Sequence, residues 1–155
     1  MKNRRETRRI RVGFVPVGGG APVSVQSMTN TDSRDARATL AQIRSLAREG
    51  CEIVRVAVPD AAAATAFGKV CGSSPIPVIA DIHFDHRLAI ACADAGAAAL
   101  RINPGNIGGE GNTREVLRAA RANRIPVRIG VNSGSVEKDL LERHGGPTPA
   151  ALVAS

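Results

Sequence analysis

The fold is decided by residues 52–82, EIVRVAVPDAAAATAFGKVCGSSPIPVIADI, which hold one complete strand–helix–strand unit. The runs at its two ends, 52–58 and 76–82, are short and almost continuously aliphatic. Strands with this pattern are typically buried on both faces of a parallel sheet. Between them, Asp60 is a good N-cap for an alanine-rich helix that we expect to end near Cys71-Gly72. This unit predicts two parallel strands joined by a helix.

The same alternation continues along the chain in both directions. Capping residues precede the helical stretches, and glycine or asparagine follows them. We expect five strands, at residues 22–28, 52–58, 76–82, 97–103 and 125–131. We expect helices from Asp32 or Ser33 to about Glu49, from Asp60 to Cys71-Gly72, from Asp85 to Ala95-Gly96, from Asn112 or Thr113 to near Asn123, and from around Ser135, with Thr148 able to cap a further one.

Repeated βα units form either an open doubly wound sheet or a TIM barrel. Five strands are too few for an eight-stranded barrel, so the sequence predicts an α/β fold that is an incomplete (β/α)8 TIM barrel. We assign residues 1–21 to a basic N-terminal arm and loop, and residues 22–155 to the partial barrel domain. The triple glycine in VGGGA (17–21) precedes a strand, so it does not match a dinucleotide or phosphate-loop fingerprint.

The composition narrows the range of functions. Apolar residues make up 43% of the 155 residues, enough for a folded core. The aromatic residues are three Phe, with no Trp or Tyr, which argues against nucleic-acid binding by base stacking. No apolar run approaches the roughly 18 residues of a membrane span, and none follows the basic N-terminus, so we expect a cytoplasmic protein without a membrane partner. The net charge of +7, largely from arginine, suits anionic ligands.

The three cysteines do not indicate a metal site. Cys51, Cys71 and Cys92 are widely spaced, and none is part of a Cys-x-x-Cys pair. Neither a zinc site nor an iron–sulfur site is predicted by such spacing. We expect all three to be small core residues.

Polar side chains gather at the C-terminal ends of the expected strands, where ligands bind in parallel βα folds. Residues two apart in a strand share a face, so Asp81 and His83 should point the same way, as should Arg101 and Asn103. Arginine suits phosphate oxygens, whereas carboxylate and carboxamide groups suit hydroxyls. The candidate substrate-binding residues are Arg55, Asp81, His83, Arg101, Asn103, Arg128 and Asn132.

A purely structural interpretation of this group stays open, in which Asp81 forms a buried ion pair with one arginine. One carboxylate cannot neutralise three guanidinium groups, which favours an anionic ligand. His83 is as compatible with a structural role as with a catalytic one. Gly105 and Gly108, in the loop after Asn103, allow backbone N–H groups to approach an anion, although such residues also occur in ordinary loops.

Five segments together resemble the bacterial 4-hydroxy-3-methylbut-2-enyl diphosphate synthases of the non-mevalonate isoprenoid pathway. They are VPVGGGAPVSVQSMTNT, IVRVAVP, PVIADIHFD, ALRINPGNIG and IPVRIGVNSGSVEKDL, and the match runs in order from about residue 8 to residue 150. The resemblance implies an N-terminal TIM barrel and a C-terminal domain that holds a 4Fe-4S cluster. It also implies reductive opening of 2-C-methyl-D-erythritol 2,4-cyclodiphosphate by a homodimer, with ferredoxin or flavodoxin as electron donor. The positions that match the family's substrate-binding motifs are Arg55, Asp81, Arg101, Asn103, Arg128 and Asn132, with His83 nearby.

The resemblance also indicates what this sequence does not carry. In the family, later barrel strands supply a lysine and a glutamate to the substrate site, and three cysteines and a glutamate of the C-terminal domain hold the cluster. Cys51, Cys71 and Cys92 match none of these ligands. We therefore expect the chain to ligate no cluster and to lack reductive activity alone. The catalytic residues stay unassigned.

Three alternatives stay open beside this one. A different TIM-barrel enzyme, acting on an anionic or pterin-like substrate, would use a similar group of Asp, Asn and Arg residues. A basic protein that binds RNA would show steeply salt-dependent binding. A truncated remnant without catalytic function would be unstable or aggregated, because an incomplete barrel exposes strand edges and apolar surface.

Overall fold

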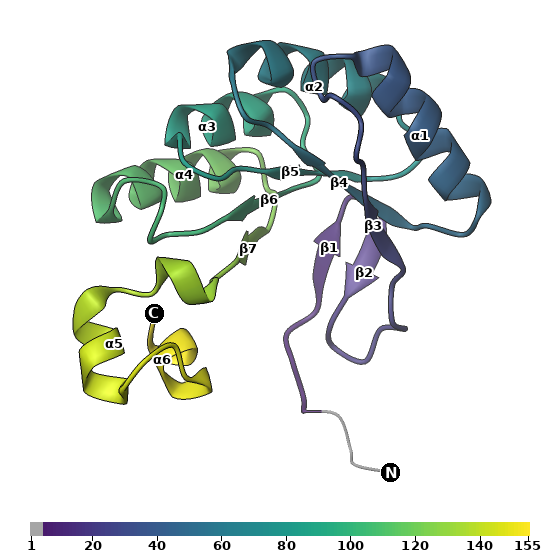
Figure 1. The fold of residues 1–155 in the computed structure, drawn as a ribbon. Helices are drawn as coiled ribbons and strands as arrows, with labels where there is room; N and C mark the ends of the chain where they lie inside the picture. The colour runs from purple at the N-terminus through teal and green to yellow at the C-terminus, as the bar shows by residue number, and fades with distance from the viewer. Residues whose placement is uncertain (1–4) are drawn as a thin grey trace.

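The structure, a computed structural model, describes residues 5–155. Five parallel strands form one sheet in the order β3-β4-β5-β6-β7, so each strand pairs with its neighbours in sequence. Helices α1 to α4 cover one face of this sheet (Figure 1). The strands are β3 (Gln26–Met28), β4 (Ile53–Ala57), β5 (Val78–Asp81), β6 (Ala99–Ile102) and β7 (Val127–Ile129), and the helices are α1 (Ala36–Arg48), α2 (Ala61–Ser73), α3 (His86–Asp94) and α4 (Glu110–Ala122). The α/β class and the incomplete barrel of βα units are confirmed.

Every strand of this sheet lies inside its predicted run and is shorter than it. The difference is largest for β3 and β7, which have three residues each, and β3, predicted at 22–28, begins only at Gln26. The backbone N–H of Val25 donates to Oε2 of Glu52 (2.8 Å), so a side chain takes the place of a strand partner there.

Three helix caps predicted from the sequence are confirmed, and two are wrong. The side chains of Asp60, Asp85 and Thr148 each accept a hydrogen bond from a backbone N–H of the first turn that follows. Helix α1 is capped by Asp35 and not by Asp32 or Ser33, because Asp32 instead accepts the backbone N–H of Arg34 and forms a turn before the helix.

The N-cap of helix α4 lies three residues before Asn112, the first of its two predicted caps. Its N-cap is Gly109, with φ +91°, a backbone conformation that favours glycine. Asn112 and Thr113, the expected caps, lie inside the first turn. There the Asn112 side chain donates to the carbonyl of Ile107, and the Thr113 hydroxyl donates to the carbonyl of Gly109.

Residues 10–17, which we had assigned to the arm and loop, contain a β-hairpin that the sequence analysis missed. Its strands, β1 (Ile10–Val12) and β2 (Val15–Val17), are antiparallel, with Val12 paired to Val15. The turn between them uses Gly13 at φ +58°, and a Cβ there would lie 2.8 Å from the Pro77 side chain. Glycine therefore serves both the turn and its close contact with the loop before β5.

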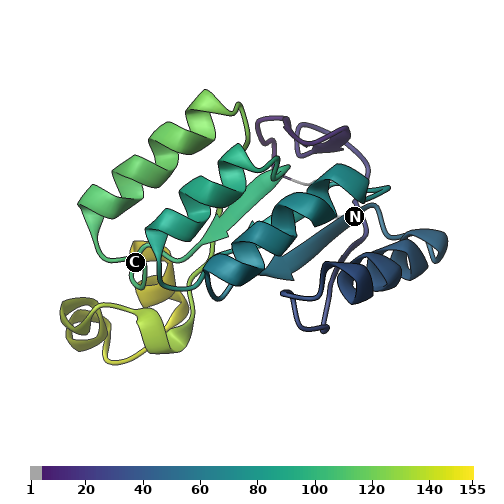
Figure 2. The ribbon, with the colours of Figure 1, turned by 90° about the horizontal axis from the view of Figure 1, so that it is seen from above.

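The hairpin covers the N-terminal end of the sheet's concave face. Val12 and Val15 are buried against Ile53, Ile79 and Ala99, one residue from each of three neighbouring strands. Figure 2 shows the hairpin at one end of the strands and the C-terminal helices at the other. The hairpin thus leaves the C-terminal ends of the strands as the accessible end of this face.

The helix-covered face of the sheet holds the main core. Successive side chains of a strand point to opposite faces, and those of Val54, Val56 and Leu100 point toward the helices, where they are at most 1% exposed. They pack with Phe67 of α2 and Ile43 of α1. Full burial of a side chain of this size stabilises a fold by about 1.5–3 kcal/mol.

The sheet is curved, but the barrel is not closed within the described residues. Nη1 of Arg128 on β7 donates to Oε1 of Gln26 on β3 (3.4 Å), which links the two edge strands across the concave face. A cavity of about 460 Å³ lies between this face and the hairpin. Met28 and Ile129, on the edge strands, are more than one-third exposed.

After β7 the chain forms three short helices: the 3-10 helix η1 (Ser133–Ser135), α5 (Lys138–His144) and α6 (Pro149–Ala154). Helix α5 starts three residues later than the predicted start at Ser135, because Ser135 belongs to η1. Among residues 5–155, the structure contains no helix that is long and apolar enough to cross a bilayer.

Candidate functional site

Asp81, the last residue of β5, is the centre of the polar group at the strand ends. Its side chain is 4% exposed, and its Oδ2 lies 3.2 Å from Nε of Arg55 on β4. Its Oδ1 lies 3.2 Å from Nη1 of Arg101 on β6. The register of the strands produces this arrangement. Asp81 pairs with Arg101 on one neighbouring strand and with Ala57 on the other. Arg55 is two residues before Ala57, so its side chain lies on the same face as that of Ala57. The structure therefore brings these three predicted site residues together. We call Arg55, Asp81 and Arg101 the strand-end cluster.

The ion pairs leave a surplus of positive charge at this end of the sheet. One carboxylate lies between two guanidinium groups, which differs from the simple pair of Asp81 with one arginine. Arg128 lies in register with Arg101 and donates to a neutral partner, the side chain of Gln26. A cluster of arginines with fewer carboxylates than guanidinium groups attracts anions.

His83 lies beside this cluster at the start of the loop after β5. Its Nε2 is 3.6 Å from Oδ2 of Asp81, and its side chain is 48% exposed. The neighbouring Phe84 packs edge-on against its ring, with centroids 6.1 Å apart, and is 71% exposed. His83 can therefore contact the Asp81 carboxylate while part of its ring stays open to a bound molecule.

Asn103 is buried, and its hydrogen bonds run to neighbouring loops. It is 2% exposed. Its Nδ2 donates to Oγ of Ser135 (2.7 Å), and its Oδ1 accepts the backbone N–H of Gly105 (3.1 Å). The Asn103 carboxamide thus joins the loop after β6 to the loop after β7.

Asn132, which is exposed, meets the same serine. Its backbone N–H donates to Oγ of Ser135 (3.2 Å), and the Ser135 hydroxyl donates to its carbonyl (3.0 Å). A hydroxyl has one hydrogen to donate and two lone pairs to accept with, so Ser135 uses its full capacity on the two asparagines. The sequence analysis missed Ser135, although its place three residues after Asn132 matches a local capping pattern.

Ser135→Ala should lower the free energy of unfolding by about 1–3 kcal/mol, because the buried Nδ2 of Asn103 loses its acceptor. Urea unfolding of the chain measures this. Ser133→Ala is the matched control, since Ser133 is exposed in the same short helix. Equal losses of stability for the two variants would show that Ser135 does not hold the loops together.

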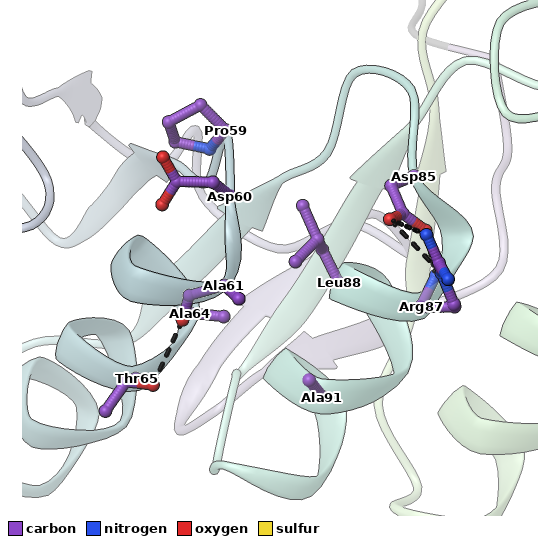
Figure 3. Close-up of a pocket in the computed structure, with 9 residues that line it drawn as sticks. All are labelled: Pro59, Asp60, Ala61, Ala64, Thr65, Asp85, Arg87, Leu88 and Ala91. Carbon is purple, nitrogen blue, oxygen red and sulfur yellow. Dashed lines mark hydrogen bonds and ion pairs between the residues drawn. The ribbon is translucent and has the colours of Figure 1, made fainter.

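A groove of about 790 Å³ between the first turns of α2 and α3 is lined by none of these residues (Figure 3). Its carboxylates already have partners. Asp60 accepts the backbone N–H of Ala63 and pairs with Arg34, and these contacts lower the pKa of its carboxyl. Asp85 pairs with Arg87, which lowers its pKa in the same way. The two carboxylates of this groove therefore serve as helix caps.

The cysteines behave as core residues, as expected. Cys51 and Cys92 are buried and Cys71 is partly buried, all three as free thiols. The Cys51 thiol donates to the carbonyl of Ile53 (3.0 Å). Burial raises the pKa of the Cys71 and Cys92 thiols from 9.0 to about 12. Protonated thiols are poor nucleophiles and poor metal ligands.

This shift predicts a pH dependence of stability. Below pH 9.0 the thiols are protonated in both the folded and the unfolded chain. Above it the unfolded chain loses these protons first, so the stability should fall from there toward about pH 12. Urea unfolding at about pH 8 and about pH 10 tests this, with a Cys71→Ala/Cys92→Ala variant as the control. The prediction fails if this variant loses as much stability as the original chain.

The fold and the strand-end cluster define a class: an α/β protein of the βα-barrel type, with its polar site at the C-terminal ends of the strands. Residues 7–155 match the family described as the GcpE TIM-barrel domain. The chain belongs to this family, which confirms the resemblance carried by the five segments.

Curated relatives agree with this assignment. The chain is 61% identical over 150 residues to the 4-hydroxy-3-methylbut-2-en-1-yl diphosphate synthase (flavodoxin) of Geobacter sulfurreducens, covering 97% of this chain and 42% of the relative. It is 57% identical over 155 residues to the protein of the same name from Maridesulfovibrio salexigens, covering 100% and 43%. It is 59% identical over 152 residues to the protein of the same name from Pseudomonas putida (strain F1), covering 98% of this chain and 41% of the relative. The chain spans about two fifths of the length of these relatives and corresponds to their N-terminal part.

Proposed function

We propose that this chain is the substrate-binding part of the barrel of a 4-hydroxy-3-methylbut-2-en-1-yl diphosphate synthase, and that the strand-end cluster binds 2-C-methyl-D-erythritol 2,4-cyclodiphosphate. The observation that carries the proposal is the surplus of positive charge around the buried Asp81. A diphosphate supplies the negative charge that this arrangement lacks. Planar guanidinium groups match phosphate oxygens in geometry as well as in charge.

The seven candidate residues in and around the strand-end cluster have distinct roles in this proposal. Arg101 and Arg128, in register on neighbouring strands, hold diphosphate oxygens. Asp81 accepts a hydrogen bond from a hydroxyl of the substrate, and its ion pair orients Arg55. His83, half exposed beside Asp81, donates to a substrate oxygen. Asn103 and Asn132, joined through Ser135, shape the loops around the ligand.

The residues described by the structure do not fit a 4Fe-4S cluster. Such a cluster needs several cysteine thiolates close together. Cys51 precedes β4, whereas Cys71 and Cys92 lie on α2 and α3 with protonated, buried thiols. Within residues 5–155 there is no group of three or more His, Cys, Asp or Glu side chains that could hold a metal ion. We therefore assign electron transfer to parts of the complete enzyme outside this chain.

The relatives' names specify flavodoxin, so we propose flavodoxin rather than ferredoxin as the electron donor of the complete enzyme. The homodimer and the cytoplasmic location stay predictions. So does the inactivity of this chain alone, which an anaerobic assay with reduced flavodoxin tests. Turnover of the cyclic diphosphate by the purified chain would refute it.

Calorimetric titration of the chain with the cyclic diphosphate tests the binding proposal. We expect binding that weakens as salt rises, because arginine–phosphate contacts are screened. The control ligand is 2-C-methyl-D-erythritol, which lacks the diphosphate and should not bind detectably. A folded chain that binds neither compound contradicts the proposal, and preferential binding of a pterin or of RNA would favour those alternatives.

A further inference from the structure

Gly130 follows β7 and lies directly against the guanidinium group of Arg101. A Cβ atom built on Gly130 would fall on Nε, Nη2 and Cζ of Arg101. A side chain at position 130 and the observed position of the guanidinium group therefore exclude each other. Arg101 lies on β6, whereas Gly130 follows β7, so the two residues are far apart in the sequence.

The backbone alone does not require glycine at this position. Gly108 and Gly109 have positive φ, where L residues are strained, but the φ of Gly130 lies outside that region. The N–H of Gly130 donates to the carbonyl of Ile102 (2.8 Å), so the backbone is tied to β6. Glycine is therefore needed here for space, and the backbone cannot readily move away to make room for a side chain.

On its other side, Arg101 is held by Asp81. Its Nη1 lies 3.2 Å from Oδ1 of Asp81, and its side chain is only 13% exposed. The guanidinium group thus lies between the carboxylate at the end of β5 and the bare backbone after β7. Its position is set by contacts on both sides.

We propose that Gly130 is a positioning residue of the strand-end site. Because it has no side chain, it leaves the space in which the guanidinium group of Arg101 lies against Asp81, in the orientation that receives the anion. This inference rests on the proposed function in naming the cyclic diphosphate as that anion. The contact between Gly130 and Arg101 is independent of the ligand's identity.

A double-mutant cycle on the full chain tests the inference, with Gly130→Ala, Arg101→Ala and the combined variant. Each is titrated with the cyclic diphosphate and unfolded in urea. Gly130→Ala should weaken binding at least about tenfold, because it displaces a buried charged ligand-binding group. In the Arg101→Ala background the same substitution should change the affinity by less than about twofold, because there is no guanidinium group to displace.

Gly134→Ala is the matched control. Gly134 lies in the same loop, has nothing within 4 Å of its Cβ position, and has no positive φ. Gly134→Ala should leave the dissociation constant for the cyclic diphosphate and the equilibrium constant of unfolding within about twofold of those of the original chain, as expected for an added methyl group in open space.

The outcomes separate this inference from the proposed function. Equal effects of Gly130→Ala in both backgrounds, on affinity and on the urea midpoint, would overturn the positioning role. If the original chain does not bind the cyclic diphosphate, the proposed function fails, while coupling between positions 130 and 101 in the urea midpoint still supports the positioning role. If Gly130→Ala does not fold, folding of the combined variant supports the inference, and its failure to fold overturns it.

Discussion

Asp81→Asn is expected to lower the free energy of unfolding by about 3 kcal/mol, because it leaves Arg55 and Arg101 close together without a counter-charge. The Asp81 side chain is 4% exposed and that of Arg101 is 13% exposed, so water replaces the lost carboxylate poorly. The loss falls at the lower end of the range for breaking a buried ion pair, since the Arg55 side chain is 23% exposed.

Urea unfolding near neutral pH measures this loss. Glu110→Gln is the control, because Glu110 pairs with Arg114 on the surface of α4 at i,i+4 spacing, with both side chains mostly exposed. That pair should contribute less than about 1 kcal/mol. If Asp81→Asn costs no more than Glu110→Gln, the strand-end ion pairs do not stabilise the fold. A bound diphosphate should restore part of the stability of the Asp81 variant, because it supplies the missing negative charge.

Arg101→Ala is expected to weaken binding of the cyclic diphosphate by about 2–5 kcal/mol, the usual loss when one partner of a buried, hydrogen-bonded charge pair is removed. Arg101 is the least exposed arginine of the ion-pair cluster and lies between the Asp81 carboxylate and the backbone of Gly130. Its position is therefore fixed before the ligand arrives, so little ordering entropy opposes binding.

Calorimetric titration of this chain, and of a complete family member changed at the matching arginine, measures the effect. Arg114→Ala on α4 is the control, since Arg114 is exposed and pairs with Glu110 on the helix-covered side. Arg101→Lys should fall between the two, because an ammonium group keeps the charge but cannot contact two phosphate oxygens as a planar fork. Unchanged affinity in Arg101→Ala would remove Arg101 from the site.

Much of this fold could be predicted from the sequence, because parallel βα units have strong local signals. Aliphatic runs, helix caps and glycines placed all five strands of the parallel sheet in order along the chain. The hairpin at residues 10–17 escaped because its two three-residue strands form an antiparallel pair outside the repeated βα units. Its stability comes from contacts with Ile53, Ile79 and Ala99, which no local pattern could reveal.

The site could be predicted in part for the same reason. The sequence predicted that Arg55, Asp81 and Arg101 gather at the strand ends, and the register of the parallel strands brings them together. The sequence could not show that one carboxylate holds two arginines, because side-chain conformations decide that. Nor could it pair Asn103 with Ser135, 32 residues away, since two loops must fold against each other before they meet.

The order of the strands has a consequence for how this sheet forms on the ribosome. Every strand from β4 to β7 pairs with the strand made just before it, and the hairpin that covers the N-terminal end is made before them all. Each new βα unit can therefore add to an edge that already exists, without waiting for a distant segment. Nascent chains stalled once β5 has left the ribosome should already resist proteolysis at the hairpin, because two of its three partner residues, Ile53 and Ile79, are by then free to contact it.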